Sequence, residues 1–231
     1  MSERTERHLA PRMEDVRLDH LVRYRWAAER ILERDWPFTG LWVADIGCGA
    51  GYGTRFIRDK LLAATIPGED GEEYRFSQNF VGGLDKADAV AYAEKHYAAL
   101  GLAFGEGTWP SLAEGKPEVD STDPNVIVAV EVLEHIYDDV GFLAWAADVL
   151  RRSDGLLLLT TPNAATRGDG SDDPFHVRHY TTEVLLERVR LYFNEVELWY
   201  QHSNGIAKAG STRLFMAETA HGICVGAGGP L

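Results

Sequence analysis

A loop with a glycine at every second position lies between a short apolar run and a predicted helix. Its glycines are Gly47, Gly49 and Gly51, and Asp45 stands two residues before the first of them. Glycine lets a ligand approach the backbone closely, and the start of a helix offers N–H groups that have no partner within the helix. At the carboxyl end of a strand, such a loop is typical of a site for a nucleotide-like ligand.

The spacing of these glycines narrows the choice of ligand. A dinucleotide fingerprint requires Gly-x-Gly-x-x-Gly, but the third glycine would fall on Tyr52 in one register and on Thr54 in the other. A phosphate-cradling loop requires a Gly-Lys-Ser/Thr sequence, which does not follow here. The sequence therefore disfavours both NAD and a phosphate-cradling loop.

Acidic residues follow further predicted strands at places where a ligand would lie. Asp85 follows an apolar run, Glu106 follows a short predicted strand, and Glu131 follows the most apolar run of the chain. Ligands of open α/β sheets bind at the carboxyl ends of the strands, and a carboxylate there can accept hydrogen bonds from ribose hydroxyls. We therefore expect Asp85 to bind a ribose.

Two segments that contain histidine follow the fourth and fifth predicted strands. The first contains Glu131, Glu134 and His135, and the second, residues 173–180, contains His176 and His179. Both lie on loops at the carboxyl edge, where a second substrate must enter. Histidine is suited to general-base catalysis at neutral pH, and carboxylates together with imidazoles can bind Mg or Mn.

Strands and helices are expected to alternate along most of the chain. Alternation at this spacing indicates βαβ units and a parallel sheet, and the last two strands, which no helix separates, indicate an antiparallel pair at the sheet edge. Residues 63–78 are expected to be a surface insertion. The predicted strands are 41–46, 80–84, 102–104, 126–130, 156–160, 196–200 and 213–216, and the predicted helices are 14–36, 53–62, 87–100, 140–151 and 183–192. We expect a flexible N-terminus over residues 1–13, a single domain over 14–217 and a C-terminal tail over 218–231.

Composition limits the partners of the protein. The 231-residue chain has a formal net charge of −13, which opposes binding to the phosphate backbone of duplex DNA or long RNA. No apolar run approaches the roughly 20 residues needed to span a bilayer, and the first residues lack the apolar core of a secretory signal. With only two cysteines, a disulfide framework is not expected, and a cytoplasmic location fits these features.

The order of these features resembles class I S-adenosylmethionine-dependent methyltransferases, particularly bacterial enzymes that modify small molecules and glycans. An acidic residue followed by Gly-x-Gly-x-Gly resembles their motif I, and residues 84–87 resemble their motif II. The resemblance covers residues from about 20 to 217. It implies a Rossmann-like α/β fold with a seven-stranded, mostly parallel sheet, a reversed last strand and helices on both faces.

The resemblance also implies S-adenosylmethionine as the cofactor and S-adenosylhomocysteine as the product. In the family pattern, Glu106 meets the adenine amino group and the N–H of Gly107 meets a ring nitrogen. A His-x-x-Arg-Tyr segment at residues 20–24 resembles one that packs over the cofactor, so Arg23 would pair with the methionyl carboxylate. The expected cofactor-binding residues are Arg23, Tyr24, Asp45, Gly47, Gly49, Gly51, Asp85, Lys86, Glu106, Gly107 and Glu131.

Transfer of a methyl group to a hydroxyl of a small molecule or a sugar is the expected reaction, with His135 or His176 as the general base. An alternative follows from the Glu-x-x-Glu-His pattern, which resembles the metal site of small-RNA 3′-terminal 2′-O-methyltransferases. Its ligands would be Glu131, Glu134, His135 and His176 (or His179). Because the same pattern is common in small-molecule methyltransferases, many of which have no metal, we do not expect one. A third hypothesis is a protein that binds the cofactor without catalysis.

Overall fold

The structure is a computed structural model that describes residues 8–34, 36, 40–67, 73–75, 80–114, 123–167, 174–203, 205–209 and 220–231. Its strands are β1 (Trp42–Ile46), β2 (Thr65–Pro67), β3 (Glu73–Arg75), β4 (Phe80–Asp85), β5 (Leu102–Glu106), β6 (Val126–Val130), β7 (Leu156–Pro162), β8 (Phe193–His202), β9 (Gly205–Lys208) and β10 (Gly222–Pro230). Its α-helices are α1 (Leu18–Leu32), α2 (Tyr52–Ala63), α3 (Ala87–Tyr97), α4 (Ser111–Glu114), α5 (Asp139–Arg151), α6 (Ala164–Arg167) and α7 (Thr182–Arg190). Two short 3-10 turns, η1 (Met13–Asp15) and η2 (Leu133–His135), complete the described elements.

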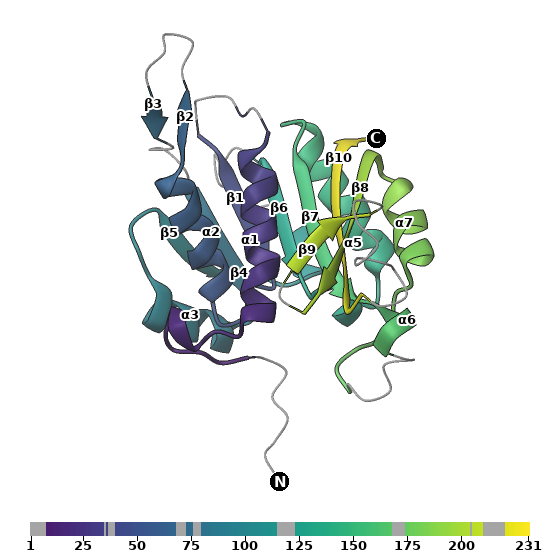
Figure 1. Cartoon of the computed structure of the whole chain (residues 1–231), viewed down its shortest axis with the longest axis horizontal. Coiled ribbons are helices and arrows are strands. Elements are labelled where there is room, and N and C mark those ends of the chain that lie inside the picture. The colour runs from purple at the N-terminus through teal and green to yellow at the C-terminus, as the bar shows by residue number, and fades with distance from the viewer. Residues whose placement is uncertain are drawn as a thin grey trace.

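An eight-stranded sheet in the order β5-β4-β1-β6-β7-β10-β8-β9 forms the centre of the molecule (Figure 1). The first five strands of this order are parallel to their neighbours, whereas β10 is antiparallel to both β7 and β8. This arrangement confirms the predicted α/β fold with a mostly parallel sheet and a reversed strand. Six of the seven predicted strands lie in this sheet, and β9 and β10 are added to them; β9 pairs antiparallel with β8 at the sheet edge.

The reversed strand comes from residues that the sequence analysis assigned to a tail. β10 lies between β7 and β8, where Cys224 pairs with Thr160 on one side and with Trp199 on the other. The domain therefore extends at least to Pro230, and the expected boundary at residue 217 is wrong. The segment was missed because glycine is unfavourable in strands, and because a strand that is buried on both faces lacks the alternation of apolar and polar residues. The predicted strand 213–216 lies outside the described residues.

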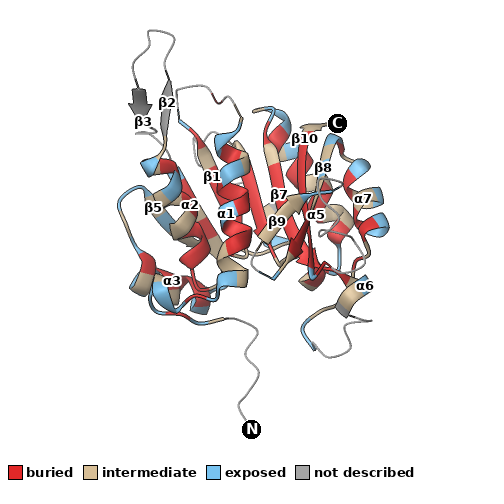
Figure 2. Cartoon of the chain, viewed as in Figure 1, coloured by how far each residue is buried: buried red, intermediate tan, exposed pale blue. Residues whose placement is uncertain are grey.

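Each face of the sheet packs against its own helices. Side chains alternate along β6: Val126 and Val128 belong to the core under α1 and α2, whereas Ile127 and Ala129 belong to the core under α5 and α7. All four side chains are inaccessible to solvent. Figure 2 shows the buried residues concentrated along the central strands and on the inner sides of these helices. The predicted helices on both faces are confirmed.

The segment between α2 and β4 contains β2 and β3, which form a separate two-stranded antiparallel sheet. This small sheet explains the long spacing between the glycine loop and Asp85. It leaves the register of the main sheet intact, since Ile46 at the end of β1 pairs with Leu84. Asp85 therefore lies at the carboxyl edge, beside the loop that follows β1.

Part of the expected flexible N-terminus packs against the domain. Ala10 is buried, and its carbonyl accepts a hydrogen bond from the hydroxyl of Tyr97 on α3. The expectation of flexibility is therefore wrong for this part of the segment, while residues 1–7 lie outside the described part of the chain. Among the described helices, none combines the length and the apolar character that crossing a membrane would require.

Candidate active site

A cavity of about 690 Å³ opens at the carboxyl ends of the five parallel strands. Its walls come from the segments that follow β1, β4, β5, β6 and β7, and from the N-terminal part of the chain. Nine of the predicted site residues line it: Arg23, Tyr24, Gly47, Gly49, Asp85, Lys86, Gly107, Glu131 and His135. Of the predicted cofactor-binding and general-base residues, all within the described chain, four do not line it: Asp45, Gly51, Glu106 and His176.

The glycine loop is tied to the end of β4 by main-chain hydrogen bonds. The N–H groups of Gly47 and Cys48 donate to the carbonyl of Leu84 at 2.8 Å and 3.2 Å. The N–H of Gly49 donates to Oδ2 of Asp85 at 2.8 Å. Gly49 has a φ of +56°, and a Cβ built on it would meet nothing within 4 Å. The loop therefore presents bare backbone to the cavity at this position.

Asp85 is held in place by the backbone on both of its oxygens. In addition to the Gly49 contact, the N–H of Lys86 donates to Oδ1 at 2.7 Å. The side chain is 8% exposed and lines the cavity. Because a carboxylate has about four acceptor positions, each oxygen can still accept a hydrogen bond from a ligand hydroxyl. This geometry suits the expected contact with a ribose.

Asp45 lies beneath the glycine loop rather than in the cavity wall. Its side chain is fully buried, and its Oδ2 accepts a hydrogen bond from Oγ1 of Thr54 at 2.7 Å. Burial raises the pKa of Asp45 to about 7. Within the described residues, its Oδ1 has no hydrogen-bond partner. Asp45 does not line the cavity, so the structure places it in support of the glycine loop and not at the predicted cofactor contact.

Gly51 also acts through packing. It precedes α2 with a φ of 87°, and a Cβ built there would lie 2.5 Å from Cβ of Ala93 on α3. Glycine is required at this position because α2 and α3 approach each other closely. The predicted ligand contact at Gly51 is therefore replaced by a structural one.

The segment after β5 differs from the predicted adenine contacts. Glu106 is exposed and does not line the cavity. The N–H of Gly107 donates to the carbonyl of Asp85 at 3.0 Å, so this N–H is used within the protein and does not meet a ring nitrogen. Trp109 instead forms part of the wall, with its ring 5.9 Å from that of Phe142.

Arg23 and Glu131 form an ion pair in the cavity wall. Nη2 of Arg23 lies 3.3 Å from Oε2 of Glu131, and Nε donates to Oε1 of Gln201 at 2.8 Å. Glu131 has a φ of 56°, an uncommon value for a residue other than glycine, and its Oε1 accepts a hydrogen bond from Oγ1 of Thr160. Arg23 is thus fixed at the cavity wall, where α1, β6 and β8 meet. Its charge is paired with that of Glu131.

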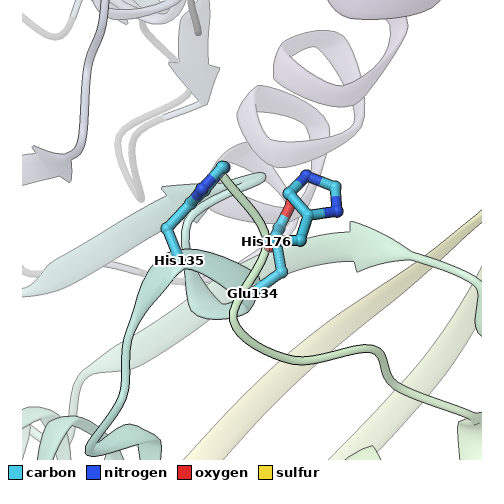
Figure 3. A group of neighbouring side chains, drawn as sticks. All are labelled: Glu134, His135 and His176. Atoms are coloured by element: carbon cyan, nitrogen blue, oxygen red, sulfur yellow. The ribbon is translucent and has the colours of Figure 1, made fainter. Parts of the chain in front are cut away.

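Glu134, His135 and His176 lie close to one another, as Figure 3 shows, and His135 lines the cavity. Each offers a ligand atom, and these atoms lie within 4.8 Å of one another. Burial and the nearby charge of Glu131 raise the pKa of Glu134 well above its ordinary value. Oε2 of Glu134 accepts from Oγ1 of Thr161, whereas Oε1 has no hydrogen-bond partner among the described residues. Glu131, the fourth predicted metal ligand, is outside this group.

The His135 ring is oriented by a main-chain carbonyl. Its Nδ1 lies 3.0 Å from the oxygen of Phe175. Because a carbonyl only accepts hydrogen bonds, Nδ1 carries the proton in the neutral ring, and Nε2 keeps its lone pair. The His176 ring lies 4.9 Å from that of His135, and the His179 ring lies 5.5 Å from that of His176. Of the two predicted general bases, His135 is the one that lines the cavity.

His20 and Tyr52 also line the cavity, although neither was among the predicted site residues. Nδ1 of His20 lies 2.9 Å from the hydroxyl of Tyr52. Burial, and secondarily the charge of Arg23, lowers the pKa of His20 to about 4. Two signals pointed to His20: it begins the His-x-x-Arg-Tyr segment, and it precedes Arg23 and Tyr24 by about one turn of α1.

Comparison with known proteins identifies the family. A family model described as a methyltransferase domain matches residues 18–206. The chain belongs to the methyltransferase domain family. A protein of Mycolicibacterium smegmatis is named "Probable S-adenosylmethionine-dependent methyltransferase" and is 31% identical to this chain. The match covers 82% of this chain and 63% of that protein. The "Ubiquinone biosynthesis O-methyltransferase" of Dinoroseobacter shibae is 33% identical over 65% of this chain and 53% of its own length. The chain thus spans between about half and two thirds of these relatives.

A solved structure supports the fold of this methyltransferase domain. The crystal structure of the small RNA methyltransferase HEN1 matches with a TM-score of 0.58 at 18% identity, over 99% of this chain and 27% of that one. This similarity concerns the fold alone. Together with the family match, it places the domain in the class I S-adenosylmethionine-dependent methyltransferases, as the sequence motifs predicted.

The family implies S-adenosylmethionine as the cofactor, and the residues of the cavity fit it. The volume of about 690 Å³ lies within the range of roughly 300–1,000 Å³ that small-molecule and cofactor sites occupy. Asp85 offers carboxylate oxygens to ribose hydroxyls, and Gly49 offers backbone without a side chain. Both features stand at the carboxyl edge of the sheet, where ligands of such folds bind.

Proposed function

We propose that this methyltransferase domain transfers the methyl group of S-adenosylmethionine to a hydroxyl oxygen of a small molecule or a sugar. The observation that carries the proposal is the His135 ring, which lines the cavity with Nδ1 on the Phe175 carbonyl and a lone pair on Nε2. A positioned histidine of this kind accepts the proton of an attacking hydroxyl. When bound, the cofactor supplies an activated methyl group on a positively charged sulfur.

The residues of the chain supply binding, orientation and a proton acceptor. Asp85 and Gly49 hold the nucleoside side, and the buried pair of Arg23 and Glu131 lies beside the remaining part of the cavity. Nε2 of His135 accepts the proton of the acceptor hydroxyl. Holding two reactants in line about 3 Å apart can supply roughly 7–11 kcal/mol of the barrier reduction, so positioning is the larger part of the task.

Two further observations support the choice of acceptor. A relative is named as a ubiquinone biosynthesis O-methyltransferase, which supports transfer to oxygen. The net charge of −13 opposes long-range attraction of a nucleic acid, which favours a small acceptor. A reducing cytoplasm remains the proposed location, because both cysteines are buried and free.

The proposal is tested with methyl-labelled S-adenosylmethionine and a cell extract that is separated into small-metabolite and RNA fractions. Label in small metabolites is expected. His135→Gln should lower the transfer rate about 10²- to 10⁴-fold and leave binding of S-adenosylhomocysteine unchanged, because the general base acts only on the acceptor. His96→Gln on α3, away from the cavity, is the matched control. Binding of the product without any transfer would instead favour the cofactor-binding protein without catalysis.

A second candidate is a metal-assisted 2′-O-methylation of RNA ends. It is favoured by the group of Glu134, His135 and His176 and by the partnerless Oε1 of the buried Glu134, which a divalent cation such as Mg or Mn would satisfy. In this mechanism the cation lowers the pKa of the acceptor hydroxyl. Label in RNA, loss of transfer on chelation and loss of transfer in Glu134→Gln would support this candidate. Chelator-insensitive transfer would exclude it.

A further inference from the structure

The segment of residues 174–180, which follows β7 and precedes α7, is fastened to the start of α5 by one arginine. Nη1 of Arg178 donates to both oxygens of Asp139 at 2.8 Å and 2.9 Å, and its Nη2 donates to the carbonyl of Tyr137 at 3.0 Å. We call these contacts the Arg178 brace. An arginine suits this position because its planar guanidinium holds several N–H groups in a rigid fork, whereas the ammonium of lysine is a compact charge on a flexible stem.

Asp139 is a rigid anchor for the brace. Its side chain is 2% exposed, and besides Arg178 it accepts hydrogen bonds from the hydroxyl of Tyr180 at 2.6 Å and from Nη1 of Arg188 at 2.9 Å. Charged hydrogen bonds of this kind are stronger than neutral ones, and a buried carboxylate with several donors has little freedom to move. Asp139 therefore holds the side chain of Arg178 in place.

The main chain of the segment is also bonded to η2, the 3-10 turn that contains His135. The N–H groups of Val177 and Arg178 donate to the carbonyl of Glu134 at 2.9 Å and 3.3 Å. The segment is thus attached to the residue before His135 and, through the brace, to the carbonyl of Tyr137 two residues after it. His135 lies between these two attached residues, and the carbonyl of Phe175, two residues before Val177, lies 3.0 Å from Nδ1 of His135.

We propose that Arg178 and Asp139 are positioning residues that hold the Phe175 carbonyl against Nδ1 of His135. They thereby keep the proton on Nδ1 and the lone pair on Nε2. The importance of that lone pair for methyl transfer rests on the proposed function, whereas the tautomer itself does not.

The physical reason is that a neutral imidazole exists in two tautomers, and the hydrogen bond at one nitrogen decides which is present. In the other tautomer Nε2 carries the proton and has no lone pair for an acceptor hydroxyl. Without the brace, only the main-chain bonds from Val177 and Arg178 to Glu134 would hold the segment. The carbonyl of Phe175 would then be held less firmly beside the ring, and both neutral tautomers would become accessible. The brace therefore acts on the base through geometry, without touching a substrate.

The test measures the tautomer directly and needs no acceptor. Histidine is labelled with nitrogen-15, and the ring nitrogen shifts of His135, assigned by comparison with His135→Gln, show which nitrogen carries the proton. Wild type and Arg188→Ala are expected to show the Nδ1–H form. Arg178→Ala and Arg178→Lys are expected to lose it in favour of a mixture of both neutral tautomers. Arg188→Ala is the matched control because it also removes an ion pair with Asp139 but lies on α7, outside the segment.

Two results would overturn the proposal. One is an unchanged Nδ1–H form in Arg178→Ala, and the other is an equal loss in Arg188→Ala, which would indicate a general loosening around Asp139. Arg178→Lys keeps the charge and the aliphatic stem, so it provides a second test of the brace if the alanine variant does not fold. A wild type that shows the Nδ1–H form but transfers no methyl group would contradict the proposed function and leave the brace standing.

A second readout separates positioning from binding. Titration with S-adenosylhomocysteine as the probe should give the same affinity in wild type and in Arg178→Lys, because Asp85 and the glycine loop are not touched by the change. In the labelled-transfer assay, kcat is expected to fall about tenfold to a hundredfold, with KM for S-adenosylmethionine unchanged, as small misplacements of catalytic groups do. A change in KM alone would contradict a positioning role.

Discussion

Asp45 and Asp85 lie near the ends of neighbouring strands but in different surroundings. Asp85 has both oxygens held by backbone N–H groups at the cavity wall. Asp45 is fully buried beneath the loop, with Thr54 as the partner of one oxygen. Burial favours the neutral acid at Asp45, and its pKa is about 7. At the scale of single residues, one carboxylate is therefore placed for a ligand and the other supports the loop.

The raised pKa of Asp45 predicts a pH-dependent stability. The folded pKa of about 7 exceeds the unfolded value of about 4, so the folded state binds the proton more tightly. This contribution to stability is present below pH ~4 and is lost as the pH rises to about 7. Asp45→Asn removes the titration, so the variant should gain stability relative to wild type over this range. Urea unfolding of both proteins at several pH values measures this difference, and a constant difference would contradict the prediction.

Gly49 and Gly51 form a matched pair for separating binding from folding. Both have positive φ, but only at Gly51 would a new Cβ meet a neighbour, 2.5 Å from Cβ of Ala93. Gly51→Ala should therefore lower the unfolding temperature more than Gly49→Ala does. Gly49→Ala should weaken binding of S-adenosylhomocysteine, because its Cβ points into open space at the cavity. Calorimetric unfolding and titration of both variants provide the measurement; equal destabilisation by the two changes would refute the distinction.

Gly49, Asp85 and His135 could be placed at the carboxyl edge from the sequence, because strand ends and loop glycines are visible there, and all three line the cavity. The sequence did not show that the N–H of Gly107 donates to the carbonyl of Asp85, because that contact joins neighbouring strands. The distinction between Asp45 and Asp85 likewise depends on burial, which arises only when helices cover the sheet. Contacts between distant segments are therefore the part of the site that the sequence did not predict.

At the scale of elements, β10 holds the C-terminal part of the sheet together. It pairs with β7 and with β8, and Val225 at its centre is inaccessible to solvent. Strands β1 and β6 were predictable as short apolar runs followed by ligand-binding loops. The glycine-rich β10 was not, because its burial comes from two neighbouring strands and not from its own sequence pattern.

A charge placed in β10 should unfold the domain. Val225→Asp buries a carboxylate without a partner, which is among the most destabilising classes of substitution, on the order of 3–5 kcal/mol. Leu231→Asp introduces the same charge at a side chain that is 54% exposed and should change stability by less than about 0.5 kcal/mol. Chemical unfolding of the two variants tests this contrast. If Val225→Asp were as stable as Leu231→Asp, the central position of β10 would be wrong.

At the scale of the whole molecule, the cavity combines segments that lie far apart in the sequence. His8 and Arg23 come from the N-terminal part, Asp85 and Glu131 from the middle, and Phe175 from the segment after β7. The βαβ pattern predicted that the strand ends would meet, because parallel strands present their carboxyl ends at one edge. That pattern did not predict that the N-terminal part of the chain would close one side of the cavity; the expectation for residues 20–24 came instead from the resemblance of the His-x-x-Arg-Tyr segment.

Isothermal titration of wild type and Asp85→Ala with S-adenosylhomocysteine is the most direct test that this cavity is the cofactor site. Asp148→Ala, an exposed change on α5, is the control. We predict binding to the wild type and to the control, and a loss of about 1.5–3 kcal/mol in binding free energy for Asp85→Ala, because a charged hydrogen-bond partner of the ribose is removed. Absence of binding to the wild type, or equal affinity for Asp85→Ala, would contradict the account.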